Sequence, residues 1–169
     1  MNWSWPFIAI AIFYFAAILQ NSFFIYFGFF GGCLNLIFIL FFSCVFFCTR
    51  NNYFKIAFFA LMAGFLLDVF SVSKIGLSIG ILVLLGFAIN KIQFQLKQKE
   101  DKYPLSYFIV IFVVSFAAYN SLFWWLSGNG NVFDWNFLWQ IIYNLLVAVL
   151  VFLIAKKFAG KNNKASKFL

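Results

Sequence analysis

Residues 54–92 read FKIAFFALMAGFLLDVFSVSKIGLSIGILVLLGFAINKI, which is two apolar runs joined by a short polar turn. A helix that crosses a membrane needs about 20 mostly apolar residues, at about 1.5 Å of rise per residue. Each run comes close to that length, so the stretch predicts an antiparallel pair of membrane helices at Phe54–Val72 and Ile75–Ile92. One acid, Asp68, interrupts the first run, and one base, Lys74, lies in the turn.

The composition of the whole chain agrees with this interpretation. Hydrophobic residues make up 66% of the 169 residues and charged residues 9%, against roughly 45–50% and about 25% in soluble domains. No Lys, Arg, Asp or Glu occurs between Met1 and Thr49. The composition therefore indicates an integral membrane protein. The 29 Phe residues are interpreted as packing and lipid-facing bulk rather than as an aromatic binding site.

The remaining apolar segments predict four further spans. The first apolar region is too long for one crossing and is broken by QNS at residues 20–22 and GG at residues 31–32, so it is divided into two short spans with an interfacial or re-entrant stretch, Phe23–Phe30, between them. The four spans lie near Trp5–Gln20, Cys33–Thr49, Leu105–Leu126 and Phe133–Ala155. The sequence thus predicts an all-α integral membrane protein, a compact bundle of about six transmembrane helices in one domain over residues 1–169.

The basic residues predict the orientation of this bundle. Lys74 alone falls on one side of the predicted spans, and the other side receives the remaining bases: Arg50, Lys55, Lys91, Lys97, Lys99, Lys102, Lys156, Lys157, Lys161, Lys164 and Lys167. Short loops rich in Lys and Arg stay in the cytoplasm, so both termini are expected to be cytoplasmic. The net charge of +8 then requires no nucleic acid, and the basic tail 156–169 is expected to contact lipid head groups or a protein.

Polar side chains inside membrane spans are costly and usually find partners in the interior of the bundle. Five of them share the predicted non-cytoplasmic half and are here named the outer polar cluster: Gln20, Asn35, Asn120, Gln140 and Asn144. Asp68 lies in the same half, near the end of its helix. A carboxylate there opposes the negative end of its own helix dipole, so its donors must come from Lys74, from Ser71 or from the start of the next helix.

Three roles are open for Asp68 from the sequence: a tie that closes the hairpin, a group that binds a partner, or a group that coordinates a solute or transfers a proton.

Small residues on the same two helices predict where the helix backbones pack together. Gly76 and Gly80 form a G-x-x-x-G pair, and Ala60 and Gly64 form a similar pair on the preceding helix. Such pairs let helix backbones approach closely, and we expect them to pack within the bundle rather than in a dimer.

The residues needed for catalysis are scarce. The chain has no His and only four acids, which excludes an imidazole-based nucleophilic relay. Its three cysteines, Cys33, Cys44 and Cys48, are too few for a Cys-only zinc site. We therefore expect no enzyme activity, no metal and no cofactor.

A family resemblance rests on the stretch that joins the first two helices described above. Gly64, three apolar residues, Asp68, two apolar residues and Ser71 form a G-x-x-x-D-x-x-S motif, and Gly76 follows after a short turn. This motif resembles that of the rod shape-determining protein MreD family. Chain length, number of spans and basic cytoplasmic ends are also similar, so the resemblance extends over nearly the whole chain.

The resemblance implies a non-enzymatic inner-membrane scaffold subunit of the bacterial cell-elongation (rod) complex, which regulates cell shape and peptidoglycan synthesis. It implies an MreC-like, membrane-anchored coiled-coil partner that faces the cell wall and, through it, an MreB-like cytoskeleton and peptidoglycan synthases. The family fold is similar to that of the substrate-binding S components of energy-coupling-factor vitamin transporters, which is the alternative expectation. S components commonly carry two alanines four residues apart on their first helix, and the alanines here include no such pair, which favours the scaffold: Ala9, Ala11, Ala16 and Ala17.

Overall fold

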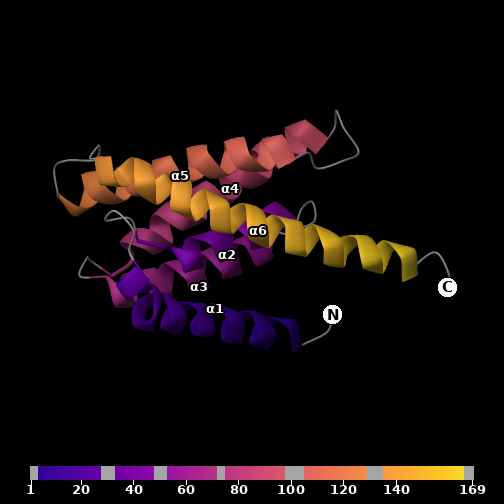
Figure 1. The fold of residues 1–169 in the computed structure, drawn as a ribbon, viewed down its shortest axis with the longest axis horizontal. Helices are drawn as coiled ribbons and strands as arrows, with labels where there is room; N and C mark the ends of the chain where they lie inside the picture. Colours follow the sequence, from indigo (N-terminus) through magenta and orange to yellow (C-terminus); the bar gives the residue numbers. More distant parts are fainter. Residues whose placement is uncertain are drawn as a thin grey trace.

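The computed structural model describes residues 4–27, 33–47, 53–71, 75–97, 105–128 and 135–165. Within these ranges the chain is all-α, with the helices α1 Ser4–Ser22, α2 Leu36–Phe47, α3 Tyr53–Phe70, α4 Leu77–Lys97, α5 Leu105–Ser127 and α6 Trp135–Ala165, and the short 3₁₀ helix η1 Phe24–Phe27. Successive α-helices run in opposite directions, so α1 begins and α6 ends at the same end of the bundle (Figure 1).

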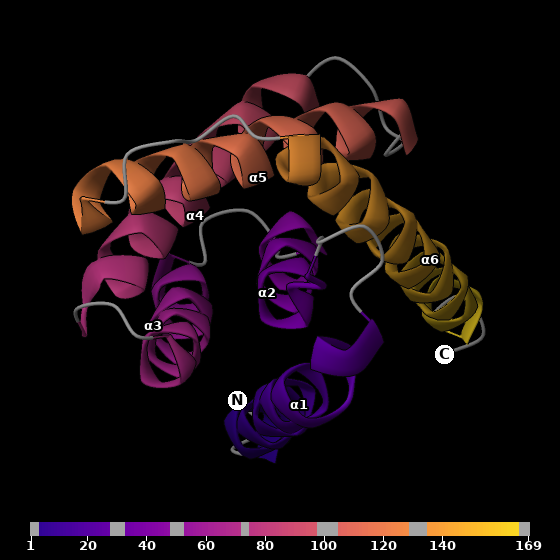
Figure 2. The ribbon, with the colours of Figure 1, turned by 60° about the vertical axis from the view of Figure 1, so that its left-hand side comes forward.

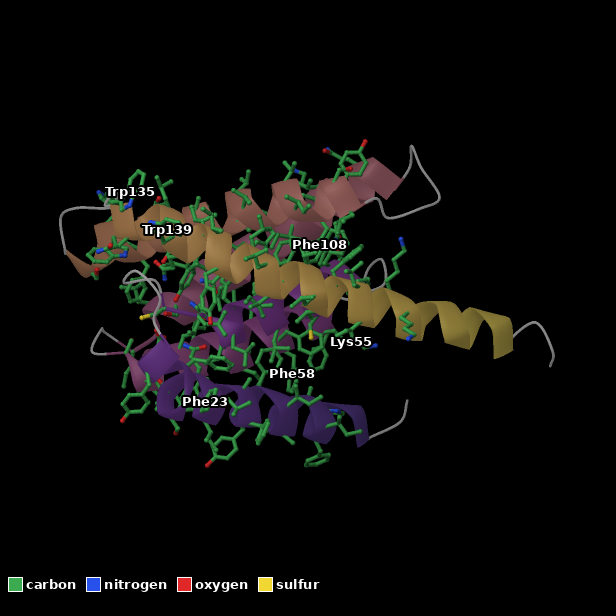
Figure 3. The ribbon with its side chains drawn as sticks, in the orientation of Figure 1. Phe23, Lys55, Phe58, Phe108, Trp135 and Trp139 are labelled. Carbon is green, nitrogen blue, oxygen red and sulfur yellow. The ribbon has the colours of Figure 1, made fainter. Side chains whose placement is uncertain are left out.

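The two ends of the bundle differ in their charge. We call one the basic end: it holds Lys55 at the start of α3, as Figure 3 shows, Lys97 at the end of α4, and Lys156 and Lys157 in the second half of α6. The opposite end, here called the polar end, is formed by the last turns of α1, α3 and α5 and the first turns of α2, α4 and α6. Among the described residues, Asp68 is the only charged side chain at the polar end.

Helix α2 occupies the centre of the bundle (Figure 2) and contacts each of the other five α-helices. It has 12 residues, which corresponds to about 18 Å at about 1.5 Å per residue. Eight of these residues are buried, and the partly exposed ones, Leu36, Leu40, Cys44 and Phe47, form one stripe along the helix. Because α2 is surrounded on almost every side, it is apolar all round instead of amphipathic.

Phenylalanine rings fill the space between α2 and α5. Phe42 packs against Phe112 with ring centroids 5.1 Å apart, and Phe46 packs against Phe108 at 5.0 Å, both edge to face. Phe38 continues the row against Phe116 at 5.2 Å. The rings recur at every fourth residue on both helices, so the two rows interlock along the axis. These buried Phe side chains therefore serve packing in the centre of the bundle.

Three helices are long and apolar enough to cross a membrane: Tyr53–Phe70, Leu105–Ser127 and Trp135–Lys157. The apolar parts of the other α-helices are shorter and lie at Pro6–Ser22, Leu36–Phe47 and Leu77–Gln93. Large apolar side chains cover the outside of the bundle, with Phe7, Leu84 and Trp125 among the most exposed at 69%, 69% and 77%. Large apolar side chains thus cover the surface of the bundle as well as filling its core.

The helix boundaries differ from the predicted spans in three places. Residues 33–35 are irregular and α2 begins only at Leu36, so the second helix is shorter than the predicted span. Helix α4 continues to Lys97 and α6 to Ala165, beyond the ends of the predicted spans at Ile92 and Ala155. Lys and Gln favour helix almost as strongly as Leu, so loss of hydrophobicity ends an apolar run without ending its helix.

Candidate functional site

The carboxylate of Asp68 joins α3 to the first turn of α4. Its Oδ2 accepts a hydrogen bond of 2.7 Å from the backbone N–H of Gly76, and its Oδ1 accepts one of 2.9 Å from the backbone N–H of Ser78. Asp68 is 1% exposed and Ser78 is fully buried. The first N–H groups of a helix have no partner within it and attract negative charge. The start of α4 therefore supplies the donors that Asp68 requires.

The other motif residues shape the same hairpin. Gly76 has a φ of +100°, a left-handed conformation that glycine adopts without a steric penalty. The backbone N–H and the hydroxyl of Ser71 both donate to the carbonyl of Asp68, at 3.3 and 3.2 Å, and close the last turn of α3. A Cβ on Gly64 would lie 2.5 Å from the Cα of Ile79. Gly64 thus lets the α3 backbone contact the α4 backbone directly.

Gly80 and Lys74 stand apart from this arrangement. Gly80 is exposed, and no heavy atom lies within 4 Å of the position its Cβ would take, so the expected close packing at Gly80 is absent from the bundle described here. The second close approach on α4 lies instead at Gly86, where a Cβ would come within 2.9 Å of Ile56. Lys74 lies outside the described residues, so its predicted pairing with Asp68 stays a prediction.

A second set of polar side chains caps the start of the central helix α2. Asn35 precedes the helix, and its Oδ1 accepts a hydrogen bond of 3.0 Å from the N–H of Phe38, the usual arrangement of an N-cap asparagine. Gln20, from the end of α1, accepts from the N–H of Ile37 at 3.1 Å. Asn144, from α6, accepts from the N–H of Asn35 at 2.7 Å. Side chains from three separate segments thus accept hydrogen bonds from three amides at this helix start.

Asn144 is fully buried and uses both ends of its amide group. In addition to the bond that it accepts, its Nδ2 donates to the carbonyls of Cys33 at 3.1 Å and of Gln140 at 2.8 Å. Gln140 contributes its backbone carbonyl to this network and is half-buried. Asn144 therefore fixes the chain before α2 against α6.

The other end of α2 is capped from α4. The Nε2 of Gln93, which is 5% exposed, donates a hydrogen bond of 3.0 Å to the carbonyl of Phe46 in the last turn of α2. A carbonyl there has no partner within the helix. Sequence reasoning missed this residue because Gln93 lies just beyond the predicted span Ile75–Ile92, and the contact joins residues 47 positions apart. No local spacing signals such a pair.

A cavity of about 240 Å³ opens at the polar end of the bundle. It lies next to the start of α2, which is the shortest α-helix among the described residues. Ten residues from α1, α3, α5 and the segment before α2 line it: Gln20, Asn21, Asn35, Leu67, Phe70, Ser71, Tyr119, Asn120, Phe123 and Trp124. Three members of the outer polar cluster, Gln20, Asn35 and Asn120, are brought together here, whereas Gln140 and Asn144 are outside the lining.

The α5 side of the cavity was foreseen only in part. Asn120, which is 7% exposed, bonds to the carbonyl of Phe116 at 2.8 Å through its Nδ2. The neighbouring Tyr119 hydroxyl lies 3.2 Å from the hydroxyl of Ser78 and connects α5 to the capped start of α4. The succession of Tyr119, Asn120, Phe123 and Trp124 is a polar and aromatic face at helical spacing. The sequence shows that spacing, but it does not show how deep in the bundle α2 begins, and the cavity depends on both.

In the part of the chain that the structure describes, no three His, Cys, Asp or Glu residues come together as metal ligands. The chain matches no protein-family model, no curated protein and no solved structure. The fold and the polar end thus define an all-α bundle with three helices long and apolar enough to cross a membrane, in which the buried side chains of Asp68, Gln93 and Asn144 cap helices.

Proposed function

We propose that the chain is a multi-pass protein of a bacterial inner membrane, with the basic end in the cytoplasm and the polar end facing outward. Its apolar exterior fits lipid, and the described bases gather at the end where α1 begins and α6 ends. Buried backbone groups need partners in hydrocarbon because water is absent there. The caps on α2 and α4 meet that requirement.

Within this membrane placement we propose a non-enzymatic scaffold subunit of the cell-elongation complex, bound to an MreC-like coiled-coil protein. The observation that carries this proposal is the geometry of the motif. Both oxygens of Asp68 are bonded to the backbone of α4, Gly64 faces Ile79, and Ser71 closes α3. Each position therefore builds a rigid hairpin, as expected for a structural protein, and leaves no reactive carboxylate. Through this partner the scaffold acts on an MreB-like cytoskeleton and on peptidoglycan synthases.

We place the contact with the partner's membrane helix near Gly80. Two motif glycines that the structure describes, Gly76 and Gly80, have open Cβ positions, but only Gly80 lies within α4, whereas Gly76 precedes it with a positive φ. Leu84, one turn after Gly80 on the same face, is 69% exposed. A glycine on an exposed membrane-facing stripe permits close approach of a second helix. The hairpin residues would then hold this surface in shape without touching the partner.

Co-expression with a tagged MreC-like protein, followed by detergent extraction and affinity capture, tests the proposal. We expect a stable complex that Gly80→Leu weakens without lowering the thermal stability of the chain, with Gly80→Ala as the matched conservative control. Asp68→Ala should reduce the complex only in proportion to the loss of folded protein. Absence of any complex with wild-type protein would refute the scaffold function.

The cavity supports a second candidate, a substrate-binding S component of an energy-coupling-factor vitamin transporter. A pocket of about 240 Å³ is somewhat below the roughly 300–1,000 Å³ of sites that hold drug-sized ligands. Tight binding of a vitamin, measured by calorimetry on the purified chain, together with failure to capture the coiled-coil partner, would favour this function over the scaffold.

A further inference from the structure

We infer that the cavity at the polar end is a binding site for a small uncharged solute that carries an amide or hydroxyl group beside a flat apolar face. The inference concerns the cavity itself and holds for either proposed function. It begins from the size of the cavity. A volume of about 240 Å³ would hold about eight waters at roughly 30 Å³ each, or one small molecule in their place.

The lining presents hydrogen-bonding atoms that the protein leaves unused. Gln20 and Asn35 each use their side-chain oxygen to cap α2, and their amide nitrogens make no hydrogen bond within the described residues. Asn21 and Asn120 show the opposite pattern, because each donates its nitrogen to a backbone carbonyl four residues earlier. Their oxygens are left as acceptors. The cavity thus offers donors at Gln20 and Asn35 and acceptors at Asn21 and Asn120.

One of these acceptors is open to the cavity although its residue is largely buried. Asn120 is 7% exposed, and its Oδ1 is not a fully buried atom without a partner; in the described residues Ser43 Oγ is the one such side-chain atom. A solute group that both donates and accepts, such as an amide or a hydroxyl, can engage Asn120 and the free amide nitrogens together. A group that only accepts can bond to the free amide nitrogens alone, and a group that only donates can bond to the free oxygens alone.

The described lining carries no charge. The nearest carboxylate, Asp68, has both oxygens bonded to α4, and the described lysines lie at the basic end or outside the cavity lining. An ion that entered would lose hydration without gaining a counter-charge, which disfavours charged ligands. The aromatic rings of Phe70, Phe123 and Trp124 instead offer apolar faces for the flat side of a neutral molecule.

Four nearly isosteric probes test the inference on the full-length chain in lipid nanodiscs: benzamide and benzyl alcohol, which are neutral, and benzoate and benzylammonium, which are charged. Saturation transfer from protein to probe is measured by NMR. We expect saturable transfer to benzamide or benzyl alcohol and at least roughly tenfold weaker binding of both ions. The ions also control for nonspecific contact with the nanodisc.

Two variants locate the binding. Asn120→Leu removes the acceptor on α5, and Trp124→Ala removes a wall residue that is 40% exposed and lies outside the core cluster. Each should lower probe affinity several-fold, whereas Asn136→Leu, an exposed asparagine on α6, should leave it unchanged. Equal binding to wild type and both cavity variants, no saturable binding of either neutral probe, or stronger binding of an ion would overturn the inference. None of these results depends on capture of the coiled-coil partner.

Discussion

Replacing Asp68 by alanine should destabilise the chain by about 3–4 kcal/mol, because it leaves two N–H groups at the start of α4 without an acceptor. Each unsatisfied buried donor costs about 1–3 kcal/mol. Ser78 is fully buried, so its N–H should incur most of that range. Gly76 is exposed, so its N–H can recover part of the loss from water. Asp68→Asn keeps one acceptor oxygen and should cost about half as much.

The free energy of unfolding can be measured by steric trapping in lipid bicelles, with Asn136→Ala as a control on the exposed face of α6. Hydrogen exchange gives an independent local measurement. The amides of Gly76 and Ser78 should exchange faster in Asp68→Ala, while those in the middle of α5 should change little. A loss below about 1 kcal/mol, with exchange at Ser78 unaltered, would refute a capping role for the carboxylate and return Asp68 to the alternatives of partner binding or solute coordination.

Four further substitutions separate the structural contributions of single groups. Gly64→Ala should destabilise the chain by about 2–3 kcal/mol, because its Cβ would overlap the Ile79 backbone. Gly80→Ala should be neutral or should stabilise the chain by up to about 1 kcal/mol, because alanine has a higher helix propensity than glycine. Thermal unfolding in detergent compares the two variants. Asn144→Leu should cost about 3 kcal/mol by leaving the cap of α2 unpaired, and equal stability to wild type in an SDS titration would contradict that cap. Ser43→Ala should leave stability unchanged or raise it by about 1 kcal/mol, because the buried Ser43 hydroxyl makes no hydrogen bond within the described residues, and a marked loss in the same titration would reveal a hidden partner.

The sequence predicts the helices of this chain better than it predicts their contacts. Hydropathy places α3 and α5 within two residues of their observed ends, because an apolar run and its helix end together there. The same pattern overestimates α2 and misses the continuation of α4 and α6, since hydropathy reports burial in lipid and not backbone hydrogen bonding. At the ends of α4 and α6 the chain stops being apolar enough for a membrane span, but the helix continues.

The candidate site shows the same division. Depth along each span correctly gathers Gln20, Asn35 and Asn144 at one end of the bundle, because their height follows from counting residues. Which amide meets which backbone group depends on the rotation of each helix about its axis, and that rotation is set by packing. Gly64 and Gly80 illustrate the limit: the same small-residue pattern lies at a helix contact in one case and on the surface in the other.

The position of Asn144 has a consequence for how the chain is made. Its bond to the start of α2 joins residues 109 positions apart, so ribosomal synthesis delivers the second helix long before its last cap. Until α6 has been synthesised, the start of the central helix lacks one of its hydrogen-bond partners. In the proposed membrane placement, a chain truncated before residue 144 should therefore be degraded faster than the full chain, even though its first five helices are complete.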